Sequence, residues 1–168
     1  MIALLYKRCL ELGKLAGALA VIFGLPYGIW QYLESKQDKR VEQTLALFRQ
    51  YNSPPFITYR ERISKAVMKN RKEILDAAKD ENQLKLVINE LLINENIEME
   101  TWLIMDFFDA VLACVKNNLC EPEVTHDLFS CRAQDVFLTF YQYIAEQRAT
   151  TANFGAGLEA IASARQEC

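Results

Sequence analysis

The chain begins with one long apolar run and continues with a series of shorter amphipathic segments. Residues 15–33, LAGALAVIFGLPYGIWQYL, contain no charged side chain and are flanked by Lys14 and Glu34. At a rise of 1.5 Å per residue, a helix of this length covers about 28 Å, close to the roughly 30 Å hydrocarbon core of a bilayer. The pattern therefore predicts a single transmembrane helix, with residues 1–34 forming an amphipathic leader and this anchor.

The anchor ends in residues that suit a membrane interface and a neighbouring helix. Amphipathic aromatic rings prefer the headgroup level, and three gather here: Tyr27, Trp30 and Tyr32. In the stretch GLPYG, Pro26 stands between two glycines, which predicts a kinked but continuous helix. Gly24 and Gly28 are spaced at i and i+4, so we expect another membrane helix to pack closely against them.

Other readings of the N-terminus fit less well. A cleaved signal peptide is disfavoured, because the small residues AGALA at 16–20 precede the most apolar part of the run instead of following it. Cys9 does not suit lipid attachment, since Lys7 and Arg8 precede it. Basic residues nearly balance across the run, so charge does not decide its orientation. A basic leader before an uncleaved apolar run is typical of a signal anchor, which favours a domain outside.

Beyond the anchor, apolar positions recur every three or four residues, as they do in amphipathic helices. Pro54 and Pro55 end the first of these segments, because proline cannot continue the helical hydrogen bonds. Pro122 begins the last, since proline is favoured at the first helical position. We expect five helices and no strand, at about residues 35–51, 56–79, 81–93, 97–118 and 122–148.

The predicted fold class is therefore all-α: an N-terminal transmembrane helix followed by a small bundle of about five helices. Residues 35–148 form the bundle domain, and its last two helices form a hairpin closed by residues 117–121. Residues 149–168 are an Ala/Gly-rich tail. From the sequence alone this tail is either docked on the bundle or mobile.

Charge is distributed unevenly along the chain, although the net charge is only −3. Residues 36–72 hold ten Lys/Arg against three Asp/Glu (+7), whereas residues 73–168 hold six against seventeen (−11). A basic block beside an apolar segment can contact anionic headgroups, for which the nearest candidates are Lys36, Lys39 and Arg40. No nucleic-acid partner is predicted, because no recognised binding motif accompanies the charge.

The stretch LACVKNNLCEPEVTHDLFSC, residues 112–131, contains three cysteines and the chain's only histidine. Zinc is disfavoured, because the spacings of Cys114, Cys120, His126 and Cys131 match no short ligand pair. A catalytic thiol is disfavoured because nothing local activates one. Simple burial and a disulfide between Cys114 and Cys120 stay open, with Cys131 as an alternative partner for either.

No catalytic signature marks the chain. It has no Gly-rich phosphate loop, no G-x-S-x-G and no H-E-x-x-H. Asp106 and Asp109 share a helical face, which suits paired carboxylates but more often marks the wet side of an amphipathic helix. We therefore expect no catalytic, metal or cofactor-binding residues, no cofactor and no small-molecule substrate.

Three stretches carry a resemblance to a known family: QYLESKQDKRVEQTLALFRQYNSPPF, IMDFFDAVLACVKNNLCEPEVTHDLF and FYQYIAEQR. Together they resemble a bacterial membrane-anchored family catalogued as domain of unknown function 4760, over about residues 25–148. The resemblance implies an anchor and a small helical domain, with no established activity. The residues most like the family pattern are Tyr51, Asn52, Ser53, Pro54, Phe107, Phe108, Cys114, Leu119 and Cys120.

Together these observations predict a non-enzymatic, single-pass, membrane-anchored interaction protein, as an accessory or assembly subunit of a larger membrane complex. Its partners would be membrane lipid and other membrane-protein subunits. A membrane-anchored sensory or regulatory module and an enzyme of unrecognised type are the alternatives. We place the anchor in the bacterial inner membrane and the domain in the periplasm, where a disulfide would persist.

Overall fold

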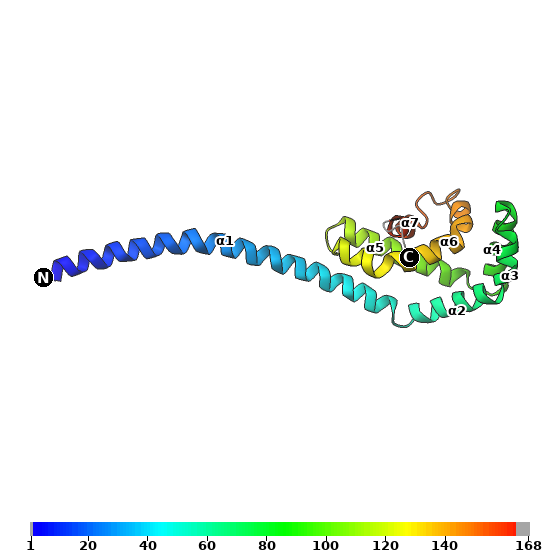
Figure 1. The fold of residues 1–168 in the computed structure, drawn as a ribbon, viewed down its shortest axis with the longest axis horizontal. Coiled ribbons are helices and arrows are strands. Elements are labelled where there is room, and N and C mark those ends of the chain that lie inside the picture. The colour runs from blue at the N-terminus through cyan, green and yellow to red at the C-terminus, as the bar shows by residue number, and fades with distance from the viewer. Residues whose placement is uncertain (1, 164–168) are drawn as a thin grey trace. The chain divides into compact units, whose positions relative to one another are not determined.

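The structure is a computed structural model that describes the backbone of residues 2–163 and the side chains of residue 24 and residues 27–163. The prediction of an all-α fold is confirmed for this part of the chain, which forms seven helices and no strand. In chain order (Figure 1) they are α1 (Ile2–Tyr51), α2 (Phe56–Lys69), α3 (Arg71–Ala77), α4 (Glu81–Asn94), α5 (Glu98–Lys116), α6 (Pro122–Gln147) and α7 (Ala156–Ala162).

The chain divides into two compact units, Met1–Lys39 and Arg40–Cys168. α1 belongs to both and continues through Pro26 without a break. Nowhere in the described residues does a helix combine the length and the apolar character that a bilayer crossing requires. The side chains of residues 1–23, 25 and 26, which make up much of the predicted anchor, lie outside the described residues. The transmembrane helix therefore stays a prediction.

In the first unit the residues predicted at the membrane interface are exposed. The exposed fractions of the three rings are 61%, 58% and 59% for Tyr27, Trp30 and Tyr32. The ammonium of Lys36 lies 4.8 Å from the centre of the Tyr32 ring. A Cβ placed on Gly24 or Gly28 would meet no atom within 4 Å. The surface of α1 at both glycines therefore has room for a neighbouring backbone.

The core of the second unit forms around the C-terminal end of α1. Tyr51, only 1% exposed, stacks on Phe107 of α5 with ring centres 5.1 Å apart. Its edge contacts reach Phe108 of α5 at 5.6 Å and Phe129 of α6 at 5.9 Å. Such pairs contribute about 0.5–1.5 kcal/mol each beyond burial. The last turn of α1 is therefore part of the domain core.

The helix predicted at 56–79 is wrong as a single element, because it breaks at Asn70 into α2 and α3. The backbone of Asn70 leaves the helical region at φ −100° and ψ 11°. Its side-chain amide donates to the carbonyl of Ala66 at 2.9 Å, the same carbonyl that its backbone N–H uses at 3.2 Å. Asparagine side chains compete with the helix in this way. The break lets α3 pack against α4.

The bundle also contains a helix that the expected five did not include. α7 packs against α5 and α6 (Figure 1), and it buries Leu158 and Ile161 beside Phe154 of the preceding turn. Of the two alternatives for the tail, the docked one therefore holds as far as residue 163, the last described. Gly157 lets α7 approach closely, because a Cβ there would lie 2.4 Å from the carbonyl oxygen of Phe108.

Candidate functional site

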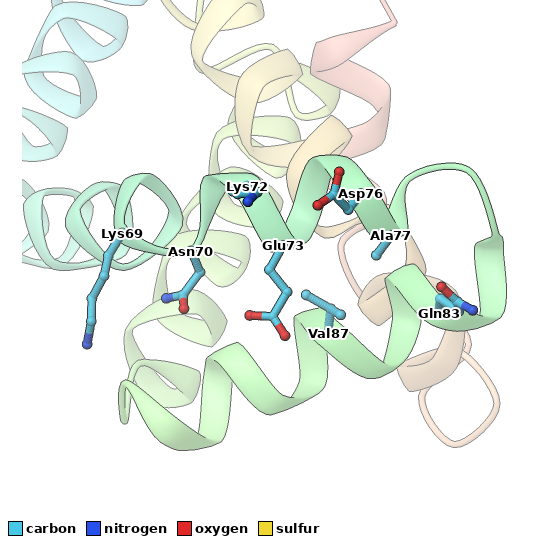
Figure 2. Close-up of a pocket in the computed structure, with 8 residues that line it drawn as sticks. All are labelled: Lys69, Asn70, Lys72, Glu73, Asp76, Ala77, Gln83 and Val87. Carbon is cyan, nitrogen blue, oxygen red and sulfur yellow. The ribbon is translucent and has the colours of Figure 1, made fainter.

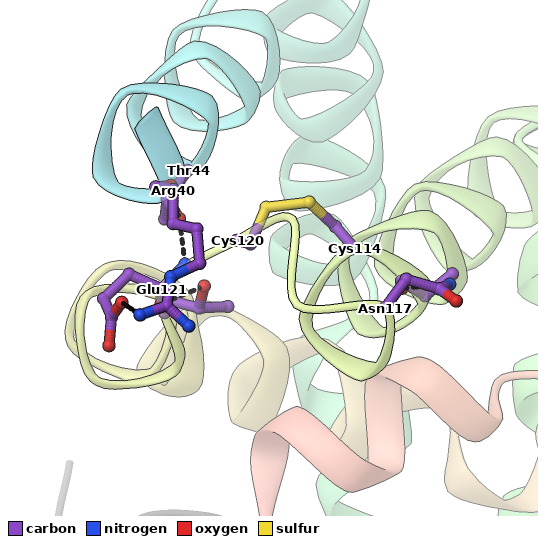
Figure 3. The surroundings of a disulfide bond; sticks show 8 residues. Arg40, Thr44, Cys114, Asn117, Cys120 and Glu121 are labelled. Carbon is purple, nitrogen blue, oxygen red and sulfur yellow. Dashed lines mark hydrogen bonds and ion pairs between the residues drawn. A yellow bond between two sulfur atoms is a disulfide. The ribbon is translucent and has the colours of Figure 1, made fainter. Parts of the chain in front are cut away.

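The cysteine-rich stretch forms a disulfide between Cys114 and Cys120, whose Cα atoms are 5.2 Å apart (Figure 3). Cys114 lies in the last turn of α5, which ends at Lys116, and Asn118 adopts the left-handed conformation at φ 56°. The N–H of Leu119 then donates to the carbonyl of Cys114 at 2.9 Å, which is the pattern of a Schellman helix end. The turn itself brings the two sulfurs together. The alternative pairing of either cysteine with Cys131 is not the one formed.

This disulfide-closed turn is attached to α1. The N–H of Glu121 donates to Thr44 Oγ1 at 3.0 Å, and the Thr44 hydroxyl donates to the carbonyl of Arg40 at 2.9 Å. Arg40 Nη2 lies 3.3 Å from Glu121 Oε2, as Figure 3 shows. Arg40 was predicted to face headgroups together with Lys36 and Lys39. Its guanidinium pairs with Glu121 in this structure, whereas Lys36 and Lys39 are exposed.

Two of the four residues considered as zinc ligands have a different role in the structure. Two of the four would-be ligands are bonded to each other as Cys114 and Cys120, so their thiolates are not free to bind metal. His126 is half-buried, with Nδ1 making no hydrogen bond in the described structure. Within the described residues, no group of three or more His, Cys, Asp or Glu side chains is placed to hold a metal ion.

Of the paired carboxylates Asp106 and Asp109 in α5, Asp109 alone packs against another element. Asp106 is exposed and Asp109 half-buried, and Asp109 Oδ1 accepts a hydrogen bond of 2.5 Å from the N–H of Gly157. Burial raises the pKa of Asp109, the neighbouring Asp106 adds to the rise, and the Gly157 bond opposes it. The Asp109 carboxylate thus fixes the first turn of α7 against α5.

The hollows on the surface of the second unit include two of more than 500 Å³. The first, about 520 Å³, lies between α3 and α4. Figure 2 shows Glu73 reaching from α3 towards α4 beside Val87, with Lys69 pointing away at one end. Lys69 is paired with Glu95 at 2.7 Å, and the walls carry the basic Lys69 and Lys72 together with the acidic Glu73 and Asp76. This cleft is polar and has no single sign of charge.

The second hollow, which we call the α2–α6 groove, has a volume of about 640 Å³. α2 and α6 form its walls, Ile104 of α5 and Tyr51 of α1 contribute to its lining, and most of the lining is apolar. The apolar positions along it are Ile63, Val67, Ile104, Val136 and Phe140. A volume of this size lies within the range of ligand pockets in proteins.

Two arginines lie at the Tyr51 end of the α2–α6 groove. The Arg60 guanidinium lies 4.3 Å from the centre of the Tyr51 ring, and that of Arg132 lies 5.0 Å from the centre of the Phe48 ring. Burial raises the pKa of Tyr51, and the charges of Arg60 and Arg132 act in the opposite direction. Arg60 Nε is buried and makes no hydrogen bond within the described residues.

The sequence analysis did not identify Arg60 and Arg132 as site residues. A signal was present, because both stand where the helical period expects an apolar residue. Arg132 falls between Leu128 and Val136 at intervals of four, and Arg60 follows Phe56 by four. A charged residue in an apolar stripe either pairs inside the fold or faces a ligand.

No family model, no curated protein and no solved structure matches this chain. The resemblance to domain of unknown function 4760 therefore stays a prediction.

Proposed function

We propose that this chain is a non-enzymatic, single-pass, membrane-anchored interaction protein that serves as an accessory or assembly subunit of a larger membrane complex. The uncharged run of residues 15–33 supports the anchor. The observation that supports an interaction partner is a pair of exposed apolar side chains, Leu86 and Ile93, on the side of α4 that faces away from the core, which we call its outer face. The same arrangement of anchor and helical domain is what the family resemblance implies.

α4 exposes two large apolar side chains on the side opposite its buried face. Its inner face buries Leu84, Ile88 and Leu91 in the core, and these residues provide the packing of α4 within the bundle. Leu86 and Ile93, seven residues apart and so on one face, point the other way with 62% and 71% of their surface exposed. Asn82 and Glu90 lie on the same side of α4, so Leu86 and Ile93 form an exposed apolar pair with polar neighbours, as in the rim and core of an interface. The outer face therefore suits a partner subunit.

Extraction of the full chain from its native membrane in a mild detergent tests this proposal. The wild-type chain should migrate as part of a complex larger than its own mass. Leu86→Glu with Ile93→Glu should release it, while the matched pair Leu119→Glu with Leu138→Glu, at positions 60% and 62% exposed, should leave the complex intact. A wild-type chain that is consistently monomeric and without a partner would contradict the proposal.

For location, we propose a periplasmic domain. The Cys114–Cys120 bond supports it, because disulfides persist in the periplasm and are rare in the bacterial cytosol. A thiol reagent that cannot cross the inner membrane tests it in intact cells that carry Cys131→Ser, Cys9→Ser and Cys168→Ser. Labelling that appears only after addition of a reductant is expected. Labelling that needs lysis and no reductant would place the domain in the cytoplasm.

The α2–α6 groove favours a second candidate, a membrane-anchored sensory or regulatory module. Such a module needs a ligand site within the domain, and the groove of about 640 Å³ is large enough for one. Measurement of the complex in the presence and absence of a groove ligand separates the two functions. Partner release on ligand binding would support the sensory module, and an unchanged complex would leave the accessory role.

A further inference from the structure

The arginines of the α2–α6 groove differ from three others in the second unit. Arg40 pairs with Glu121 at 3.3 Å and Arg148 with Glu159 at 2.7 Å, and Arg62 pairs with Glu100. Within the described residues neither Arg60 nor Arg132 forms an ion pair, although both are half-buried. The fold thus leaves two half-buried guanidinium groups in one groove that no carboxylate of the described residues pairs with.

Their surroundings orient these charges for a ligand. Arg60 lies over the Tyr51 ring and Arg132 over the Phe48 ring, so aromatic contacts position both guanidinium groups before any anion arrives. Arg132 uses one N–H on the carbonyl of Leu128 at 2.9 Å, which leaves other donors unused. A guanidinium binds carboxylate and phosphate through two parallel hydrogen bonds. The acidic residues of the groove, Glu61 and Asp135, do not occupy these donors, because no ion pair joins them to either arginine in the described structure.

Most of the apolar residues of the groove follow the two arginines along α2 and α6. Along α2 it runs from Arg60 to Val67 and Met68, and along α6 from Arg132 to Val136 and Phe140. Eight residues of helix extend about 12 Å, and over that length both helices contribute apolar residues to the groove, with polar ones such as Lys65 and Thr139 between them. Ile104, fully buried, lies beneath the two helices. A charged end and an apolar trough match a ligand that has an anionic head and a hydrocarbon tail.

We propose that the α2–α6 groove binds an anionic amphiphile, with its carboxylate or phosphate head against Arg60 and Arg132 and its hydrocarbon tail along Val67, Val136 and Phe140. A free fatty acid and a membrane phospholipid both supply this chemistry. The site goes beyond the proposed function, and it does not rest on it, because the groove lies within the second unit and away from the outer face of α4.

Native mass spectrometry of the full chain, released from neutral detergent, tests the proposal with three probes of equal chain length. These are oleate, 1-oleoyl-lysophosphatidate and uncharged monoolein. One bound oleate or lysophosphatidate is expected, with at least tenfold preference over monoolein. Preference for oleate identifies a free fatty acid as the natural source, and preference for lysophosphatidate identifies a phospholipid. Equal binding of monoolein, or no binding of either anion, overturns the proposal.

Variants separate the head contacts from general charge effects. Arg60→Gln with Arg132→Gln should weaken binding of the anion at least tenfold, while the matched pair Arg49→Gln with Arg71→Gln, both on exposed helix surface, should change it less than twofold. Equal effects of the two pairs overturn the proposal. Hydrogen exchange of the wild-type chain gives a readout that needs no variant. Oleate should protect amides of residues 60–68 and 132–140, and protection confined to other helices overturns the assignment.

Discussion

Gly157 is the position where the smallest change should have the largest effect on the fold. Replacing it by alanine adds one methyl group, but that Cβ would lie 2.4 Å from the carbonyl oxygen of Phe108 and 2.5 Å from Cα of Asp109. Both atoms belong to the backbone of α5, so no rotamer change can relieve the overlap. α7 must move outward by about 1 Å to reach the 3.4 Å of ordinary contact.

The magnitude follows from three terms. Overpacking of this kind costs about 3 kcal/mol at the upper end of its usual range. The hydrogen bond from the Gly157 N–H to the Asp109 carboxylate stretches with the same movement, and loss of a bond to a charged group costs about 1.5 kcal/mol or more. Alanine gains about 1 kcal/mol over glycine in helix propensity. The variant should therefore lose about 3–4 kcal/mol in its free energy of unfolding.

Trp102 reports on this change directly, because its ring packs 4.5 Å from the Phe154 ring at the start of the α7 segment. The chain has two tryptophans, so a Trp30→Phe background leaves Trp102 as the only one. Urea unfolding followed by its fluorescence should show a lower midpoint for Gly157→Ala. Gly28→Ala is the matched control, since its methyl meets nothing within 4 Å. If the two variants unfold within about 0.5 kcal/mol of each other, the close approach of α7 to α5 is refuted.

Three further predictions concern other parts of the molecule. Replacing Cys114 and Cys120 together by serine should lower the free energy of unfolding by about 2 kcal/mol on the chain-entropy model for so short a loop, as measured by urea unfolding against the oxidised wild type; an unchanged midpoint would count against the bond. Burial, with the charges of Glu98 and Glu146 adding to it, raises the pKa of Tyr143 to about 12, so stability should fall as pH rises from about 10 to about 12, where only the unfolded phenol has lost its proton. Ultraviolet titration should lose its step near 12 in Tyr143→Phe, and loss of a step near 10 instead would contradict this. Replacing Gly24 and Gly28 together by leucine should weaken assembly while membrane insertion is retained, as cross-linking in membranes can measure; unchanged assembly would argue against packing at these glycines.

The helices were the most predictable part of the fold, because their signal is local. Apolar spacing placed α4, α5 and α6 to within two residues of their observed ends. The Cys114–Cys120 bond could be proposed as well, since a turn cysteine six residues after a helical one comes within reach when the helix ends near Asn117. These features depend on neighbours in sequence.

Features that depend on distant neighbours were not predictable. The seven residues of α7 are too few to show a helical period, and the close approach at Gly157 exists only because α5 lies against it. The α2–α6 groove also depends on residues that are distant in sequence. Arg60 and Arg132 stand 72 residues apart, and only the fold places both beside Tyr51. Within the apolar pattern of a single helix, each arginine is one charged residue, and the pattern does not show that the other lies in the same groove.

The C-terminal part of α1, which belongs to the second unit, is held there by several contacts. Tyr51 fills the aromatic core, and Thr44 and Arg40 hold Glu121 one residue after the disulfide. These contacts hold residues 40–51 of α1 within the second unit, beside the turn that the Cys114–Cys120 bond closes. The same Tyr51 lies beneath Arg60 at the charged end of the α2–α6 groove. A ligand head drawn to Arg60 therefore acts on the residue through which α1 enters the core, which is the contact a coupled sensor would need.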